Sequence, residues 1–144
     1  MSRSQFAGTW RLVSSEMRTS SGQLHYPLGQ DCAGNLIFDL DGNFSAQRMR
    51  VDRPEFASGD IVRGTTDEIK AAYEGYVAFW AKSEVDEAKH ELTYVIKGSL
   101  FPNWVGHTNL RYYEFEGNRL TLRTPSFLMA GEETVGVLVW ERIS

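Results

Sequence analysis

The chain has little cysteine, because Cys32 is the only one among its 144 residues. One cysteine cannot form an internal disulfide, and it cannot supply the ligands of a cysteine-based zinc cluster. This usage is typical of a reducing compartment, so we expect a cytoplasmic protein. Cys32 itself is best interpreted as a small buried hydrophobic residue.

An excess of basic residues is also missing. The sequence has 15 lysines and arginines against 19 aspartates and glutamates, which gives a formal net charge of -4. Nucleic-acid-binding domains concentrate positive charge on one face, so this balance predicts no nucleic-acid partner. No apolar run approaches the length of a membrane span, and residues 1–6 contain no apolar signal-peptide core. We therefore expect no membrane partner.

Motifs for metals, nucleotides and hydrolytic triads are absent as well. The histidines, His25, His90 and His107, are far apart in the sequence and form no paired metal-ligand spacing, and no calcium-binding loop pattern occurs. The sequence has no glycine-rich phosphate loop and no Gly-x-Ser-x-Gly elbow. The chain therefore predicts neither a metal nor a cofactor.

What the chain does contain is a series of short alternating segments, over a length, 1–144, that is typical of one domain. The spacing Thr65-x-x-Glu68 predicts a capping box and one short helix, which has one apolar stripe and ends at Gly75. The stretch 76–86 could continue that helix, but its aromatic and β-branched residues favour a strand. Alternation and turn residues predict eight strands, at residues 9–18, 35–40, 44–51, 76–86, 91–97, 108–115, 119–124 and 134–142. Such a meander predicts an all-β fold, an eight-stranded up-and-down antiparallel β-barrel able to hold one small ligand.

Two hairpins determine which side chains face the predicted interior. A three-residue loop ending at Gly42 would pair Phe38 with Phe44 and carry Arg48 inward, whereas a two-residue loop would reverse the face. We favour the first register because it keeps the apolar residues together. A two-residue turn at Gly117-Asn118 places a mostly apolar row on the inner face, formed by Arg111, Tyr113, Phe115, Leu120 and Leu122.

The two ends of the chain carry a recognisable pair of motifs. Gly8-Thr9-Trp10 and Trp140-Glu141-Arg142 resemble the closure signature of lipocalin and calycin barrels, in which the tryptophan plugs the floor and the arginine packs across its ring. Trp10 and Arg142 are therefore implied to be structural. Four further stretches are similar to the lipocalin-like domain of small bacterial and fungal proteins: 25–29 (HYPLG), 52–60 (DRPEFASGD), 98–106 (GSLFPNWVG) and 111–114 (RYYE). This resemblance spans nearly the whole chain and implies a small calycin-type barrel. Similar barrels include cofactor-independent cyclases and isomerases of small-molecule biosynthesis.

The segment 100–107 joins two predicted strands and is rich in aromatic and polar residues. In one interpretation it lines the mouth of the barrel, where Asn103, Trp104 and His107 contact the ligand. In the other it is a rigid plug, in which Phe101 and Trp104 cap the core.

Arg111 is predicted to be an inward charge on an apolar wall. Weak alternation over residues 9–18 places Glu16 on the inner face as well, together with Trp10. An unpaired buried guanidinium is costly, so Arg111 must meet a carboxylate, several carbonyls or a ligand anion. A structural ion pair with Glu16 and a ligand-binding role both remain open, and Arg48 raises the same question.

The main functional hypothesis is a barrel that binds a small hydrophobic or amphipathic organic molecule. The alternative is a cofactor-independent cyclase or isomerase that uses the same pocket, with proton transfer by Glu16, Tyr94, His107 or Tyr113. A third hypothesis is an interaction module whose interior is filled by its own side chains. The predicted ligand-binding residues are Arg48, Asn103, Trp104, Arg111, Tyr113, Phe115 and Leu122.

Overall fold

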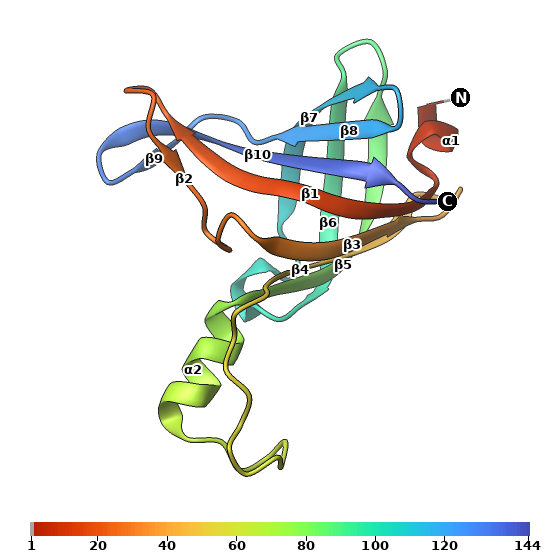
Figure 1. Ribbon diagram of the computed structural model, residues 1–144. Coiled ribbons are helices and arrows are strands. Elements are labelled where there is room, and N and C mark those ends of the chain that lie inside the picture. Colours follow the sequence, from red (N-terminus) through yellow and green to blue (C-terminus); the bar gives the residue numbers. More distant parts are fainter. Residues whose placement is uncertain (1) are drawn as a thin grey trace.

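The computed structural model describes residues 2–144, and Figure 1 shows antiparallel strands that curve around one interior. Three helical segments are found in this part of the chain: α1 (Ser2–Phe6), α2 (Thr66–Glu74) and the 3-10 turn η1 (Pro102–Trp104). The strands are β1 (Gly8–Thr19), β2 (Leu24–His25), β3 (Cys32–Phe38), β4 (Asn43–Arg50), β5 (Tyr76–Asp86), β6 (Glu91–Ser99), β7 (Thr108–Glu116), β8 (Arg119–Arg123), β9 (Phe127–Met129) and β10 (Glu132–Arg142).

The sheet closes on itself. Its strands follow the order β2-β1-β3-β4-β5-β6-β7-β8-β10-β9, and an additional pairing joins β1 to β10. The predicted eight-stranded antiparallel barrel is therefore confirmed, and residues 76–86 form a strand. The short strands β2 and β9 were not predicted, because two or three residues cannot show a period-two alternation. β2 pairs with the end of β1, and β9 pairs with the start of β10, at the same end of the barrel.

Both predicted hairpin registers are present. Phe38 pairs with Phe44 across a loop in which Gly42 has a φ of 91°, a left-handed conformation that favours glycine. Arg48 consequently lies on the same face of β4 as Phe44. Across the second hairpin Tyr113 pairs with Leu122, as the turn at 117–118 predicts.

A β-bulge changes the inner face of β1. The pairing of β1 with β10 shifts between Leu12 and Ser14, where β1 contains one extra residue. Beyond this point Ser15 pairs with Leu138, a residue that lines the interior, so that buried Ser15 rather than Glu16 continues the inner row of β1. The prediction that Glu16 shares one inner face with Trp10 was wrong, because alternation reverses at the bulge. Glu16 nevertheless borders the outer end of the barrel, where it lines a hollow together with Ser15 and Met17.

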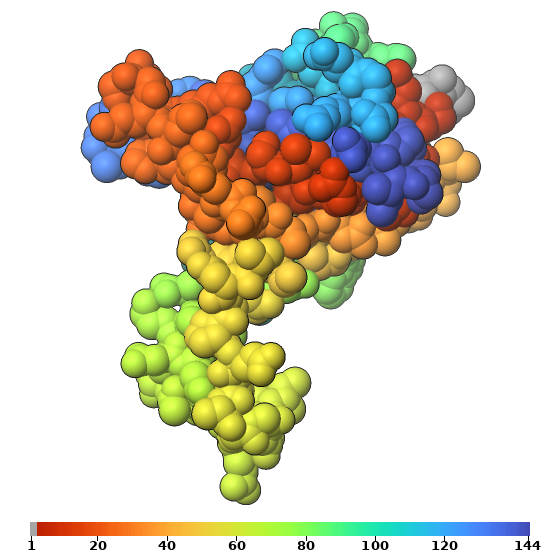
Figure 2. Space-filling view, viewed as in Figure 1, coloured from red at the N-terminus to blue at the C-terminus, as the bar shows by residue number. Residues whose placement is uncertain are grey.

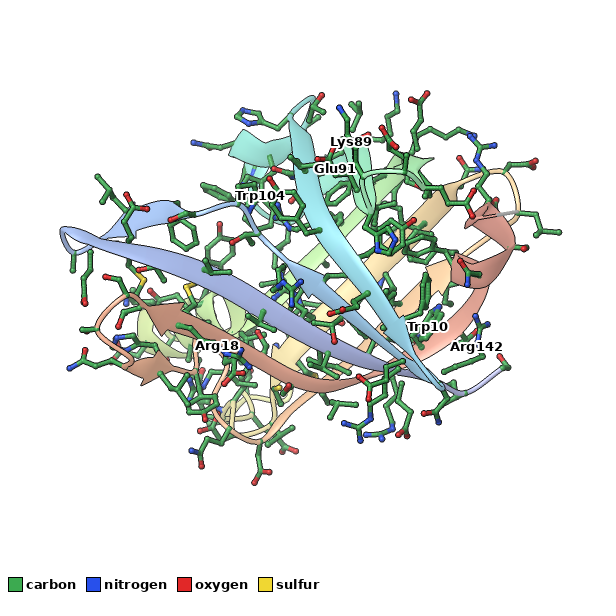
Figure 3. The ribbon with its side chains drawn as sticks, turned by 90° about the horizontal axis from the view of Figure 1, so that it is seen from above. Trp10, Arg18, Lys89, Glu91, Trp104 and Arg142 are labelled. Carbon is green, nitrogen blue, oxygen red and sulfur yellow. The ribbon has the colours of Figure 1, made fainter. Side chains whose placement is uncertain are left out.

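The barrel is closed at the end where the two chain ends meet. Trp10 is only 1% exposed, and the Arg142 guanidinium carbon lies 4.3 Å from the centre of its ring system. Figure 3 shows these two side chains together at one end of the barrel. The Trp10 Nε1–H donates to the carbonyl of Phe6 at 2.9 Å, and the Phe6 ring packs against Phe115. We call this layer the floor.

One segment stands away from the barrel, as the yellow and green atoms of Figure 2 show. This arm consists of residues 51–75 and contains α2. The capping box predicted at Thr65 and Glu68 is present, and Gly75 caps the helix. No residue of α2 is buried, so its apolar stripe lies outside the core. At the base of the arm the Arg53 guanidinium lies 4.9 Å from the centre of the Tyr76 ring.

Candidate functional site

The barrel interior contains an inner cavity of about 120 Å³ above the floor. Its walls are mainly aliphatic and aromatic, and the side chains of residues deep in the sheet, such as Leu92 and Ile96, are almost completely buried. The lining residues are Leu36, Phe38, Phe44, Ala46, Arg48, Phe79, Leu92, Tyr94, Ile96, Trp104, Asn109, Arg111, Leu122, Leu138 and Trp140. An apolar enclosure of this kind is typical of a small-molecule site.

A larger outer hollow of about 530 Å³ lies at the end of the barrel away from the floor. It is bounded by the ends of β1, β8 and β10 and by the start of β7, including Met17, Thr108, Thr124 and Gly136. Six residues line both the inner cavity and the outer hollow: Arg48, Trp104, Asn109, Arg111, Leu122 and Leu138. We call these residues the neck, because a ligand in either space would contact them.

Arg48 reaches the neck from β4, where the tight hairpin at Gly42 sets its face. Burial lowers the pKa of its guanidinium, since a charge is costly away from water, and the positive charge of Arg111 acts in the same direction. Tyr94 and Cys32 act in the opposite direction. Among residues 2–144 the Arg48 guanidinium has no hydrogen-bond or ion-pair partner.

Arg111 reaches the neck from β7, which places it next to Leu92 of β6. Its Nη1–H donates to the backbone carbonyl of Leu110 at 2.7 Å, and its guanidinium carbon lies 5.6 Å from the centre of the Tyr94 ring. Glu16 does not pair with it, because the Glu16 carboxylate accepts from Arg18 at 2.6 Å. The structural ion pair considered from the sequence is therefore wrong.

Tyr94 interacts with both arginines and packs against the apolar wall of the cavity. It pairs with Asn109 across β6 and β7, and its ring stacks on Phe79 with the ring centres 5.8 Å apart. Burial raises the pKa of its phenol, while the positive charges of Arg111 and Arg48 partly offset that rise. Tyr94 is the one predicted proton-transfer residue that lines the inner cavity.

The segment 100–107 contributes one side chain to the neck. Trp104 packs edge-on against Phe79, with ring centres 6.2 Å apart, and against Phe101 at 5.4 Å. Asn103 and His107 are exposed and line neither space. The loop is held to β6 by its backbone, since Ile96 N–H donates to the His107 carbonyl. The predicted ligand contacts of Asn103 and His107 are therefore not supported by their positions.

Tyr113 and Phe115 face inward as predicted but lie at the floor. Both pack edge-on against Phe6 at 4.9 Å, and Tyr113 stacks on His90 at 5.4 Å. Neither is among the residues that line the cavity or the hollow. The structure thus places them in the closed end, whereas Leu122, the partner of Tyr113 on β8, lines both spaces at the neck.

Sequence reasoning did not identify several lining residues. Asn109 shares the inner face of β7 with Arg111, so the alternation that selected Arg111 could have found it. Trp140 was assigned to the closure motif alone, yet it lines the cavity; its buried Nε1–H has no hydrogen-bond partner within the described residues. Phe79 lies in the ambiguous stretch 76–86.

Metal-binding clusters and membrane-spanning helices are absent from the part of the chain that the structure describes. Between residues 2 and 144, no group of three or more histidine, cysteine, aspartate or glutamate side chains could hold a metal ion. None of the helices found there is long and apolar enough to cross a membrane.

Comparison with known proteins agrees with this architecture. Residues 7–143 match the sequence model of the lipocalin-like domain. A protein of Aspergillus oryzae (strain ATCC 42149 / RIB 40), described as a 4'-hydroxy-3'-methoxypropiophenone carrier protein, is 26% identical over 106 residues. That alignment covers 69% of this chain and 96% of the Aspergillus protein.

Proposed function

The chain belongs to the lipocalin-like family, and we propose that it binds one small, mostly apolar organic molecule in the inner cavity. The observation that carries this proposal is the apolar cavity of about 120 Å³, which shares the six neck residues with the outer hollow. Burial of apolar ligand surface in such a cavity contributes about 25 cal/mol per Å². The polar groups at the neck would orient the molecule.

The Aspergillus relative supports a class of ligand. Its name describes a carrier of an aromatic ketone that has one ring with hydroxyl and methoxy groups. A single ring of that kind suits a narrow cavity with aromatic walls, including Phe44 and Phe79. We therefore propose substituted aromatic ketones and phenols as the first compounds to test.

The test is a fluorescence titration with 4'-hydroxy-3'-methoxypropiophenone. Trp104 and Trp140 line the cavity, so saturable quenching of tryptophan emission is expected on binding. Ala46→Phe would fill the cavity and should abolish the saturable signal. Gln47→Phe, on the adjacent position of the same strand, is the matched control, because it faces outward and should bind normally.

Circular dichroism and the melting temperature establish whether each variant is folded. If Ala46→Phe is unfolded because the core is overpacked, Leu122→Phe fills the same cavity from the opposite wall. Unchanged binding in a folded variant of either kind would contradict the proposal, as would the absence of saturable binding by the unaltered protein across a panel of single-ring aromatics.

Catalysis by the same pocket is the second candidate, and it depends on Tyr94. The other three candidates have less support, because none of them lines the inner cavity. Glu16 borders the outer hollow but pairs with Arg18, His107 is exposed, and Tyr113 belongs to the floor. Binding without chemistry is therefore the better-supported function. Chromatography of bound compounds after incubation, with Tyr94→Phe as control, would reveal any cyclisation or isomerisation.

The proposed setting is the cytoplasm, and its support is the single cysteine, which is typical of a reducing compartment. The net charge of -4 supports the absence of a nucleic-acid partner. An interaction module with a completely filled interior is not supported, because the interior contains a cavity.

A further inference from the structure

We infer that the ligand is an organic acid with a single aromatic ring, and that Arg48 and Arg111 together hold its oxygen anion at the neck while the ring lies in the inner cavity. This inference rests on the proposed function, because it concerns the occupant of the same cavity. It adds the chemical class of the ligand, and it assigns the ring to the inner cavity and the anionic group to the neck.

The first argument is the number of unused donors at the neck. A guanidinium carries five N–H donors. Arg111 uses one of them on the Leu110 carbonyl, and Arg48 uses none within the described chain. Both arginines line the cavity and the hollow, so the remaining donors lie beside the space that a ligand would enter. Planar guanidinium groups match carboxylate and phenolate oxygens well.

The second argument is uncompensated charge. Arg48 and Arg111 line the same two spaces, and burial together with the positive charge of Arg111 lowers the pKa of the Arg48 guanidinium. Over residues 2–144 no carboxylate lies within ion-pair distance of either group. Glu16 lines the outer hollow with them, but its carboxylate is paired with Arg18. Two like charges beside one apolar cavity favour a bound anion, which would compensate both.

The third argument is size. The inner cavity of about 120 Å³ is slightly smaller than an apolar cavity of about 150 Å³ that is known to bind benzene. It therefore accommodates about one aromatic ring, and the apolar walls below the neck would exclude a charged group. An acid whose ring occupies the cavity has its anion at the height of Arg48 and Arg111, and any further substituent extends into the outer hollow of about 530 Å³.

The experiment compares two probes of equal shape by calorimetry at neutral pH, 3-phenylpropanoate and its uncharged amide. The unaltered protein should bind the acid at least about 10-fold more tightly, which is the range expected for charge-assisted hydrogen bonds. Arg48→Met and Arg111→Met should each remove most of that preference, while the affinity for the amide stays within about 3-fold. Arg123→Met is the matched control, because Arg123 is an exposed arginine that pairs with Glu114 on the outside of the barrel.

A second arm distinguishes a carboxylate ligand from a phenolate ligand. The absorbance of 4-nitrophenol reports its ionisation, so a site built for phenolate should lower the pKa of the bound phenol, and Arg48→Met should reverse that shift. An acid preference in the first arm alone identifies carboxylates, and a shift in the second arm alone identifies phenolates. Either result supports the inference.

Equal affinity for the acid and the amide, together with no shift of the bound phenol, would overturn the inference and leave the proposed binding function intact. If the protein bound no single-ring probe, neutral or charged, both the inference and the proposed binding function would be overturned. Equal losses for acid and amide in a folded arginine variant would show that the side chain only shapes the cavity.

Discussion

Arg142 lies over the indole of Trp10, with its guanidinium carbon 4.3 Å from the ring centre, and donates through Nη1 to the carbonyl of Ala7 at 2.7 Å. It also donates to the carbonyl of Gln5. One side chain from the last strand therefore joins the first strand and the segment before it. This contact closes the floor at the end of the barrel opposite the neck.

The floor contact predicts a large effect of Trp10→Ala on stability. Trp10 is almost completely buried, so its removal should lower the free energy of unfolding by about 3–5 kcal/mol, as measured by urea denaturation. A double-mutant cycle with Arg142→Met should give a coupling of about 0.5–2 kcal/mol, the range for a cation on an aromatic face. Additive effects would mean that the two side chains close the barrel independently.

Trp104 is predicted to act on binding more than on stability. It is partly exposed and lines both spaces at the neck, so Trp104→Ala should weaken binding of a neutral aromatic probe by about 10-fold, because a buried ring contact is lost. The melting temperature should change little. Phe101→Ala is the control, since Phe101 touches Trp104 but lines neither space. A large loss of stability with unchanged affinity of the folded fraction would favour a rigid plug.

The faces of the strands were predictable where a short loop determines the register. The three-residue loop at Gly42 and the turn at residues 117–118 place Arg48, Arg111 and Leu122 on the inner wall, as the sequence indicated. Alternation determines the face of a side chain but not its level along the barrel axis. Tyr113 was therefore placed correctly inside, yet it lies at the floor rather than in the cavity.

Other features left no usable signal in the sequence. The bulge between Leu12 and Ser14 inserts one residue without a glycine or proline to mark it, and this was enough to misplace Glu16. Phe6 closes the floor from a five-residue helix, which is too short to show periodicity. Backbone hydrogen bonds between the loop 100–107 and β6 determine the position of His107. Amino-acid composition does not reveal such bonds.

Arg111→Met is predicted to be tolerated by the fold. No carboxylate within the described residues pairs with Arg111, so the substitution leaves no buried charge without a partner. Arg111 is partly buried and has no ion-pair partner, so its replacement by an apolar side chain of similar length should leave the free energy of unfolding unchanged or slightly higher. Urea denaturation measures this directly. A loss of about 3–5 kcal/mol would instead indicate that Arg111 has a fixed anionic partner.

Glu68 is predicted to make the arm sensitive to acid. Its carboxylate accepts from the backbone N–H groups of Thr65 and Ala57, and these hydrogen bonds lower its pKa in the folded state. The unfolded value is about 4.3. Because the folded pKa is the lower one, the stabilisation is fully present above the unfolded pKa and is lost as the pH falls through the folded pKa. Cα chemical shifts of residues 66–74, followed by NMR from pH 7 to pH 3, should therefore show loss of helix, while the Trp10 indole signal reports an intact barrel.

Glu68→Gln is the variant that isolates this effect. An amide oxygen can still accept a hydrogen bond but does not titrate over this range, so the variant should show weaker capping at neutral pH and little further change on acidification. Lys70→Gln, which removes the ion pair with Glu74 on the same helix, should retain the acid response of the unaltered protein. An acid response of the same size in Glu68→Gln would assign it to another carboxylate, for which the neighbouring Asp67 in the first turn of α2 is the first to test.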